Sequence, residues 1–492
     1  MYSFIPSTSS HHRAPSKDQL TTRQGYLLGC SSLHLIGNKH IGRRQFYIAA
    51  TSNNTNNSNL PKERTQKVET ITTMAPLTPE QVQIIKATVP VLAQHGETIT
   101  TKFYADMLEA HPGLKNVFNN THQATGHQPR ALAGSLYAYA SNIDDLGKLS
   151  PAVELICHKH ASLYIRPEHY NIVGEYLLKT MKTVLGDAAT PDILGAWEAA
   201  YWQLANIMIN KEDGLYKEAD GWTDWKDFKI VRKEKEAEEI TSFYLQPMDS
   251  NLKLPIFKPG QYISVNVFVD ELDGGVWQAR QYSLSDAPGK DYLRISVKRE
   301  PGVEVGEPRH FTHPGYLSNI MHEKKNVGDV VQVSHPWGDF YFDEEKEDKD
   351  APIVLISAGV GLTCLNSILN TTLEHSASRP VTWIQGARDS KTRAFKKEID
   401  DLAAKKSNLH TVYFSSSPKE AEVQGQDYDI KSRVNLDNVD KKVLFTDNDK
   451  TLYFTCGPEQ FMLDVEAKLK TYGVPAERVH MELFGTGGVP RV

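Results

Sequence analysis

Cysteine is scarce in this chain, and long apolar runs are missing. Its 492 residues include four cysteines, which stand far apart: Cys30, Cys157, Cys364 and Cys456. This spacing excludes a disulfide framework and a cysteine-based zinc or iron–sulfur site, and it fits a reducing compartment. No apolar run approaches the roughly 20 residues that cross a bilayer, and so no integral membrane association is expected.

Neither sign of charge dominates the chain as a whole. Its net charge of −6 gives no support for a nucleic-acid partner or for binding to an anionic membrane. Charged residues make up 24% and hydrophobic residues 40%, which is ordinary for a globular protein. Because 492 residues are too many for one core, about three domains are expected.

Acidic residues are almost absent from the first part of the chain. Residues 1–62 contain one acid, Asp18, against seven Lys and Arg. An Arg-rich, Ser-rich and acid-poor leader is typical of a mitochondrial transit peptide, and Arg43-Arg-Gln-Phe46 resembles a matrix-processing site. A second interpretation stays open, in which this stretch is a tail or an upstream start and a cytoplasmic product begins at Met74. In either case residues 1–73 are expected to add nothing to the fold.

Residues 74–218 show helical periodicity and predict an all-α domain. Thr78-Pro-Glu-Gln81 supplies an N-cap, a proline at the first helical position and a capping box. Ser150-Pro151 opens another helix, whose apolar face runs from Val153 to Tyr164, and residues 192–210 form a third.

After Asp220 the pattern changes to short strands. In residues 223–347 they stand between Pro, Gly and Asp, which predicts an antiparallel β-barrel: Phe228–Arg232, Ile240–Gln246, Tyr262–Val269, Gln281–Leu284, Leu293–Lys298 and Val330–Val333. In residues 350–492 strands alternate with helices, which predicts an α/β domain with a parallel sheet: Ile353–Ser357, Val381–Gln385, Thr411–Phe414 and Leu452–Thr455.

A glycine turn, Gly359-Val-Gly361, follows an apolar strand and precedes a helix. Such a turn presents backbone amides at a helix N-terminus to a dinucleotide pyrophosphate. Alone it is a weak signal, because many strands end in Gly-x-Gly for steric reasons. Arg280-Gln-Tyr-Ser283 stands about 75 residues upstream of this segment, and Cys456-Gly-Pro458 about 95 downstream. Three motifs in this order indicate a flavin reductase.

The motif Arg280-Gln281-Tyr282-Ser283 offers what a flavin needs. Arginine suits the pyrophosphate, tyrosine gives a flat face beside the isoalloxazine, and serine gives a hydroxyl near the reactive ring nitrogen. A strand tyrosine in isolation is usually a core residue. Two further motifs favour the flavin interpretation, namely Pro259-Gly-Gln-Tyr262 upstream and Gly315-Tyr-Leu-Ser318-Asn319 downstream, which starts a helix.

These motifs resemble those of the ferredoxin–NADP reductase superfamily, which hold FAD and NAD(P)H. The resemblance assigns the nucleotide to Gly359, Val360, Gly361, Leu362, Thr363 and Cys364, and closure of the nicotinamide pocket to Cys456, Gly457 and Pro458. It places the aromatic ring of Leu483-Phe484-Gly485-Thr486 against the flavin. The family usually has proline where this chain has Cys364. That change would loosen the turn without removing a phosphate-binding amide, so binding should survive.

The segment Gly386–Arg393 after the next strand bears on the choice of nucleotide. Cations at this place suit the 2′-phosphate of NADPH, and an acid suits the ribose hydroxyl of NADH. Arg388, Ser390, Lys391 and Arg393 favour NADPH, whereas Asp389 favours NADH. Charges in loops are usually just solvated. We expect NADPH to be preferred, with NADH also used.

His160 lies on the apolar face of a predicted helix, where a lone histidine is more often a core residue than a ligand. Its surroundings nevertheless contain motifs at globin-like intervals: Phe103-Tyr104, Asn116-Val-Phe118, Gly126-His-Gln128 with Leu132, Lys159-His160 and Pro167-Glu-His-Tyr170. Together with the reductase motifs they make the chain, from about Pro76 onward, resemble a flavohaemoglobin.

The resemblance implies haem b with His160 as the axial ligand of the iron. Tyr170 and Glu212 match the pair behind that histidine, where they would give the imidazole imidazolate character. Lys159, beside the ligand, would tune the iron potential. Without the resemblance, Tyr170 would be a helix-start aromatic and Glu212 a solvated acid.

On the other side of the haem the resemblance assigns polar and apolar groups. Tyr104 and Gln128 match the distal donors that stabilise negative charge on bound O₂. Phe118 and Leu132 match apolar side chains that pack on the haem and limit the entry of water.

The activity that the resemblance implies is that of a nitric oxide dioxygenase acting in detoxification under nitrosative stress. Two NO and two O₂ become two nitrates while one NAD(P)H is oxidised through FAD and haem, and a monomer is expected. Two other functions stay open. One is an oxygen- or NO-sensing or storage globin whose reductase keeps the iron ferrous. The other is a haem-free reductase for quinones or ferric chelates, which would show no Soret band.

Overall fold

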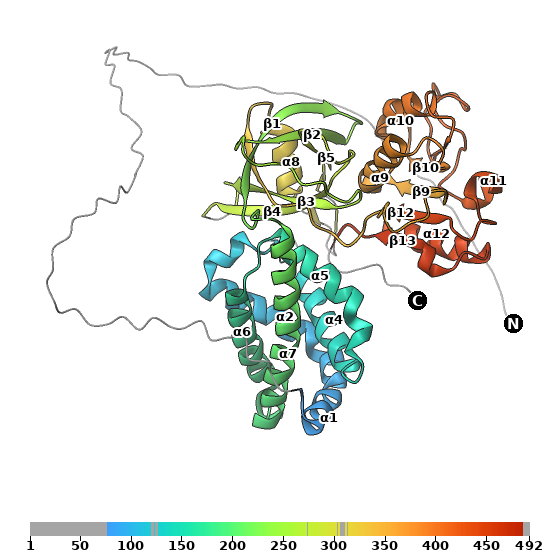
Figure 1. Cartoon of the computed structure of the whole chain (residues 1–492). Helices are drawn as coiled ribbons and strands as arrows, with labels where there is room; N and C mark the ends of the chain where they lie inside the picture. The colour runs from blue at the N-terminus through green and yellow to red at the C-terminus, as the bar shows by residue number, and fades with distance from the viewer. Residues whose placement is uncertain are drawn as a thin grey trace, which may run out of the picture. The chain divides into compact units, whose positions relative to one another are not determined.

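The computed structural model describes residues 76–119, 123, 126–272, 274–302, 304–305, 310–311 and 313–485 (Figure 1). The predicted leader, residues 1–73, and Thr486 lie outside this range. None of the helices within it is both long enough and apolar enough to cross a bilayer.

The first part of the described chain is helical, as predicted. Its helices are α1 (Pro79–Ala87), α2 (Val89–Ala110), α4 (His127–Ser141), α5 (Ser150–Ser162), α6 (Pro167–Leu185) and α7 (Pro191–Glu218), with short 3₁₀ turns η1 (Pro112–Asn116), η2 (Leu146–Leu149) and η3 (Gly186–Ala188). The capping box at Thr78 is confirmed. The Thr78 hydroxyl accepts from the Gln81 backbone amide at 3.2 Å, and the Gln81 side-chain oxygen accepts from the Thr78 backbone amide at 2.9 Å.

Two boundaries in this region differ from the sequence prediction. The helix α5 ends at Ser162, so Tyr164 lies beyond it, with φ at +56°. The Tyr164 hydroxyl accepts instead from the His335 backbone amide of the barrel region. The helix therefore stops before Tyr164, although the apolar spacing in the sequence continues to that residue. The helix α7 continues to Glu218, eight residues past the predicted end, because Glu212 and Leu215 are buried.

The middle region forms an antiparallel barrel, as predicted. Its strands are β1 (Lys226–Lys235), β2 (Ile240–Pro247), β3 (Tyr262–Val269), β4 (Val276–Ser283), β5 (Leu293–Lys298) and β8 (Val330–Val333), in the order β4-β3-β8-β1-β2-β5. An antiparallel bridge between Leu284 and Ile295 joins the two ends of that order and closes the barrel. A separate two-stranded sheet pairs β6 (Glu304–Val305) with β7 (His310–Phe311). The helix α8 (Tyr316–Glu323) packs Leu317, Ile320 and Met321 into the barrel core.

The last region is a parallel sheet flanked by helices, again as predicted. Its strand order is β11-β10-β9-β12-β13, from β9 (Ile353–Ala358), β10 (Val381–Ala387), β11 (Leu409–Ser415), β12 (Leu452–Cys456) and β13 (Val479–Glu482). The sequence prediction missed β13. The other elements are η4 (Gly359–Gly361), α9 (Leu362–His375), η5 (Ser390–Thr392), α10 (Lys396–Ala403), η6 (Leu436–Asn438), α11 (Lys441–Leu444), α12 (Glu459–Thr471) and η7 (Ala476–Arg478).

Alternate residues of β9 enter two different apolar cores, one on each face of the parallel sheet. Ile353 and Leu355 join one, and Val354 and Ile356 join the other. Because β9 and β12 are parallel neighbours, their carboxyl ends meet at one edge of the sheet. The topology therefore brings the turn after β9 beside Cys456–Pro458 after β12.

A buried ion pair ties the barrel to the α/β region. Arg294 of β5 donates to both carboxylate oxygens of Glu398, at 2.9 and 3.1 Å. Asn366 of α9 donates to the same carboxylate at 3.0 Å and to the Ser285 carbonyl at 3.0 Å. A charged group this deeply buried is stable only when its partners are in place, so these bonds set how the two regions meet.

Candidate functional site

A histidine, a tyrosine and a glutamate from three helices meet inside the helical region. The His160 Nδ1 atom lies 2.8 Å from Glu212 Oε1 and 3.0 Å from the Tyr170 hydroxyl, and the Tyr170 hydroxyl donates to Glu212 Oε1 at 2.6 Å. The side chain of Glu212 is 3% exposed and that of His160 is 31% exposed. This burial rules out the alternative that Glu212 is a solvated acid.

This triad determines which histidine nitrogen can bind a metal. A carboxylate accepts hydrogen bonds, so Glu212 selects the tautomer that carries its proton on Nδ1 of His160. The Nε2 atom then keeps its lone pair for a ligand. Burial first, and Glu212 second, raise the pKa of Tyr170, which therefore remains a proton donor to the carboxylate. The arrangement fits one axial bond to a haem iron, and the described residues hold no cluster of three or more His, Cys, Asp or Glu that would bind a bare metal ion.

The predicted distal groups also come together. The Gln128 side chain of α4 is near enough to Tyr104 of α2 to lower the pKa of its hydroxyl slightly against the effect of burial. The Tyr104 ring meets that of Phe118 edge to face, with centroids 5.5 Å apart. Burial raises the pKa of Tyr104, so its hydroxyl stays protonated. The Oε1 atom of Gln128 is buried without a hydrogen-bond partner. Leu132 and Phe118 pack against the same core. An unpartnered polar atom among apolar side chains fits a site that a further group completes.

The helix that carries His160 is bonded directly to the barrel. Ser162, two residues after His160, accepts from Gln281 Nε2 at 3.2 Å and from the Ser264 hydroxyl at 3.0 Å. Its own hydroxyl donates to the Lys159 carbonyl at 2.8 Å. Ser162 thus joins the predicted haem ligand to the predicted flavin motif. The sequence analysis did not find it, because a serine at a helix end carries no signal for a distant partner.

The flavin motif occupies the end of β4. Tyr282 and Ser283 pair across the sheet with Ile263 and Tyr262 of β3. Arg280 donates to the Ala279 carbonyl at 2.7 Å and to Gln278 Oε1 at 3.4 Å, both of which are neutral. Burial lowers the pKa of Arg280 to about 10. A partly buried cation whose hydrogen-bond acceptors are neutral suits the pyrophosphate of a dinucleotide.

The other residues predicted to contact the flavin differ in exposure and in hydrogen bonding. Ser318, in the first turn of α8, donates to the Gly315 carbonyl at 3.1 Å and accepts from the Glu300 amide at 3.2 Å, so its hydroxyl proton is already engaged within the protein. Phe484 stands 43% exposed next to the partly buried Leu483. The Gly485 carbonyl accepts from Lys159 Nζ at 2.6 Å.

The nucleotide turn has the conformation that its glycines predict. Gly359 has φ at +61°, which favours glycine. A Cβ atom on Gly361 would overlap the Cys456 carbonyl, so only glycine allows the two segments to touch. The Thr363 hydroxyl donates to the Val360 carbonyl at 3.1 Å, which holds the turn at the start of α9. Pro458 is the N-cap residue of α12.

The cations predicted for the 2′-phosphate are only partly available. Arg393 is 3% exposed and donates to the Phe414 carbonyl and the Ser415 hydroxyl, so it has a structural role inside the sheet. The Ser390 hydroxyl donates to Glu422 at 2.7 Å. Arg388 is exposed but paired with Glu239. The structure therefore weakens the argument for NADPH that rested on this segment.

A charged cluster that the sequence analysis missed lies next to the predicted haem ligand. It comprises Lys159, Asp339 and Glu482, the last residue of β13. Burial lowers the pKa of Lys159, whereas burial first and Asp339 second raise the pKa of Glu482 from 4.5 to about 8. Two acids and one lysine that are partly withdrawn from water and interact with one another therefore carry fewer charges than they would in water. The sequence offered no signal for Glu482, because β13 was not recognised.

This cluster predicts a pH dependence of stability. Below pH 4.5 the Glu482 carboxyl is protonated in both the folded and the unfolded protein. Between pH 4.5 and about 8 it keeps its proton only in the folded protein. The unfolded state then binds fewer protons, so stability falls as pH rises through this window. We expect the Tm of Glu482→Gln to decline less between pH 5 and 8.5 than that of the unmodified protein. Glu477→Gln, at an exposed position, is the control and should follow the unmodified protein. Parallel curves for all three would contradict the prediction.

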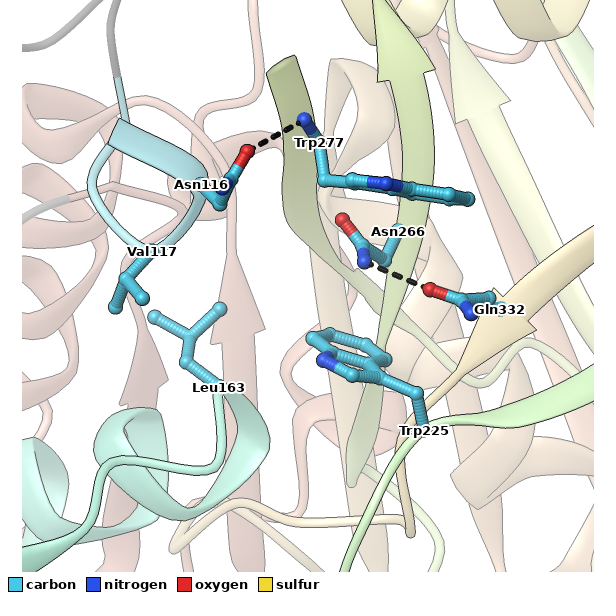
Figure 2. Close-up of a pocket in the computed structure, with 7 residues that line it drawn as sticks. All are labelled: Asn116, Val117, Leu163, Trp225, Asn266, Trp277 and Gln332. Carbon is cyan, nitrogen blue, oxygen red and sulfur yellow. Dashed lines mark hydrogen bonds between the residues drawn. The ribbon is translucent and has the colours of Figure 1, made fainter. Parts of the chain in front are cut away.

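A cavity of about 310 Å³ lies where the helical region meets the barrel. Figure 2 shows Asn266 and Gln332, joined by a 3.0 Å hydrogen bond, between the indole rings of Trp225 and Trp277. The Trp277 amide donates to Asn116 Oδ1 at 2.9 Å. The residues assigned to the haem, flavin and nucleotide do not line this cavity, although Asn116 and Val117 come directly before Phe118 in the chain.

Comparison with known proteins agrees with this arrangement. A globin family model matches residues 101–208, and a model of the oxidoreductase NAD-binding domain matches residues 355–467. The chain is 45% identical to a flavohemoprotein of Bordetella parapertussis over 418 residues, which cover 84% of the chain and 100% of that relative. It is 43% identical to one of Bacillus subtilis over 408 residues, or 82% and 96%.

A solved structure agrees over the same extent. The crystal structure of a flavohemoglobin from Malassezia yamatoensis with bound FAD and heme is similar, with a TM-score of 0.72 and 29% sequence identity. The similarity covers 84% of this chain and 100% of that one.

Proposed function

This chain belongs to the flavohaemoprotein family, and from this premise we propose that it is a nitric oxide dioxygenase. It is an oxidoreductase that uses haem, FAD and NAD(P)H and converts NO and O₂ to nitrate. The observation that carries the proposal is the His160–Tyr170–Glu212 triad, with bonds of 2.6 to 3.0 Å. Tyr104 and Gln128, which match the distal groups of the family, support it.

His160 would hold a haem and Arg280 and its neighbours a flavin; when bound, these groups would supply the O₂ binding and the one- and two-electron redox chemistry that side chains lack. Residues of the chain would support this redox chemistry at two places, the His160 triad and the Tyr104 hydroxyl. Glu212 accepts the Nδ1 proton of His160 and so makes the imidazole a stronger electron donor through Nε2. The Tyr104 hydroxyl, kept protonated by burial, donates toward negative charge that develops on the distal side.

The reductase residues act mainly by position. Gly361 lets the nucleotide turn lie directly against Cys456, at the sheet edge where a nicotinamide would be held. Arg280 offers a partly buried positive charge for a pyrophosphate. The hydrogen bond between Gln281 and Ser162 joins the flavin motif to the end of the helix that carries His160, and so places the two predicted redox sites near each other.

A direct assay tests the proposal. The purified full-length protein with bound haem and FAD is expected to consume NO only when both O₂ and NAD(P)H are present, with nitrate as the product. Sustained NAD(P)H oxidation during NO consumption separates this enzyme from a sensing or storage globin, which would bind ligand without turnover. The absence of a Soret band would favour the haem-free reductase instead.

The choice of nucleotide is a separate proposal. With Arg393 and Ser390 bonded inside the protein, the exposed cations of this segment are Lys391 and Arg388, and Arg388 would have to exchange its Glu239 partner for a 2′-phosphate. We still expect NADPH to be used in preference and NADH to be accepted. Measurement of kcat/KM for both nucleotides decides this, and a tenfold advantage for NADH would contradict it.

Location, domain boundaries and assembly complete the proposal. The bacterial relatives give the mitochondrial alternative no support, and we place the enzyme in the cytoplasm as a monomer. We keep the domain boundaries at residues 74–218, 223–347 and 350–492.

The N-terminal sequence of the native protein tests the location, since a start near Phe46 would indicate import and cleavage. Deletion of residues 1–73 should leave NO consumption intact.

A further inference from the structure

The turn between β1 and β2 of the barrel lies against Gly386–Arg393, the segment that follows β10. Ala237 in this turn and Ile240 directly after it are buried in the apolar core of the α/β region. The backbone amide of Glu238 donates to the Lys391 carbonyl at 2.7 Å. These contacts hold the tip of the turn next to the segment that bears on the choice of nucleotide.

Glu239, the last residue of this turn, pairs with Arg388 of the segment. Its carboxylate accepts from the Arg388 guanidinium, and the side chains of Glu239 and Arg388 are 35% and 61% exposed. The Glu239 carbonyl accepts from the Arg299 amide at 2.7 Å, and the Arg388 carbonyl accepts from the Ser417 amide at 2.8 Å. Both backbones are therefore held in place, while the two charged groups still face water and can exchange partners.

We propose that Glu239 is a specificity-determining residue, which competes with the 2′-phosphate of NADPH for Arg388 and so limits the preference for NADPH over NADH. In a sheet of this kind the adenosine ribose of a bound dinucleotide lies at the end of the second strand, which here is β10. The inference rests on the proposed function in one respect, namely that this segment contacts the ribose of the nucleotide.

The acids around the segment favour such a competition. Asp389 pairs with Lys419 at 2.9 Å, so this cation is already engaged. Ser390 donates to Glu422 through its amide at 3.0 Å and through its hydroxyl at 2.7 Å, and so holds a second carboxylate close by. A 2′-phosphate adds up to about two negative charges. It must therefore displace the carboxylate that Arg388 already binds, whereas the 2′-hydroxyl of NADH need not.

The variant Glu239→Gln separates charge from shape. Glutamine keeps the length of the side chain but removes the negative charge, so Arg388 is released for the phosphate. We expect kcat/KM for NADPH to rise about threefold to tenfold and that for NADH to change by less than about twofold, since exposed charge interactions have effects of this size. The gain should appear in KM and not in kcat, because the 2′-phosphate contributes equally to substrate and transition-state binding. It should also shrink at high salt, which screens exposed charges.

The test uses the full-length holoenzyme and ferricyanide reduction driven by NADPH or by NADH. Glu271→Gln is the matched control, because Glu271 is an exposed barrel glutamate that pairs with Lys324, and it should leave both nucleotides unaffected. In an Arg388→Gln background the gain from Glu239→Gln should be smaller. An equal gain with and without Arg388, or an equal change for NADPH and NADH, would overturn the proposal.

A binding measurement separates this proposal from the proposed function. Adenosine 2′,5′-bisphosphate and 5′-AMP differ only in the 2′-phosphate, and calorimetry compares their affinities for the same holoenzymes. In Glu239→Gln the bisphosphate should bind about threefold to tenfold more tightly, with AMP unchanged. An unchanged ratio of affinities would overturn the competition. If the unmodified enzyme oxidises neither nucleotide, the proposed function fails, while this ratio still decides the role of Glu239.

Discussion

Replacement of His160 by alanine is expected to abolish NO consumption. Its Nε2 atom is the one nitrogen that the Glu212 bond leaves free to hold iron at this position. Without it the helix α5 offers no axial ligand there, and the purified variant should lack a Soret band. The reductase half does not depend on this side chain, so NAD(P)H-driven reduction of ferricyanide should continue at close to its original rate. Absorption spectroscopy and an NO electrode measure the two losses.

A histidine on the same helix provides the matched control. His158 lies two residues from His160, contacts Glu154 at 3.2 Å and accepts from the Gly338 amide of the barrel at 3.2 Å. The variant His158→Ala should weaken the contact with the barrel but retain the Soret band. If His160→Ala still consumed NO, or if both variants lost haem equally, the assignment of His160 as the ligand would be wrong.

Replacement of Glu212 by glutamine is expected to lower the rate of NO consumption by about 10- to 100-fold, the range found when a partner behind a metal-binding histidine is changed. Glutamine keeps the shape and can still accept from His160 and Tyr170, but it lacks the negative charge. The imidazole then donates less electron density, and the iron midpoint potential should become more positive. A redox titration of the haem measures this shift, which a purely structural defect would not produce in this direction.

Glu154→Gln is the control for the loss of a carboxylate near the same helix. Glu154 is on α5 but points to the surface, where it pairs with Lys211 at 2.8 Å. Its removal should leave the midpoint potential unchanged. Tyr170→Phe should give a smaller shift than Glu212→Gln, because it removes a hydrogen bond from the carboxylate and leaves the charge in place. Equal potentials for Glu212→Gln and the unmodified protein would contradict the role of the triad.

Several features of the fold could be predicted from the amino-acid sequence alone. The capping box at Thr78, the glycine turn at Gly359–Gly361 and the change from helical to strand periodicity after Asp220 all appear where they were expected. Each depends on residues within a few positions of one another, so the local chain determines it. The motif order likewise indicated a globin followed by a flavin reductase, and the family comparison agrees.

The fine composition of the site could not be read in the same way. Arg393 looked like a phosphate ligand but is a buried structural donor to β11, and Ser390 is bonded to Glu422. Nothing in the sequence marked Glu482, because the strand that carries it is only four residues long. Ser162 gains its importance from Gln281, 119 positions away. Interactions of this kind arise when separate elements pack, and no short-range pattern encodes them.

By itself, therefore, the sequence determined the helical, barrel and parallel-sheet regions and the motifs for haem, flavin and nucleotide, since periodicity, caps and turns act over short distances. Only the tertiary structure decided that Glu212 is a buried partner of His160 and that Gly361 lies against the Cys456 backbone. Both contacts join residues that lie far apart in the chain and become neighbours when helices or strand ends converge. Burial, which exists only in the packed molecule, then shields the Glu212 carboxylate from water and leaves it to accept from Tyr170 and His160.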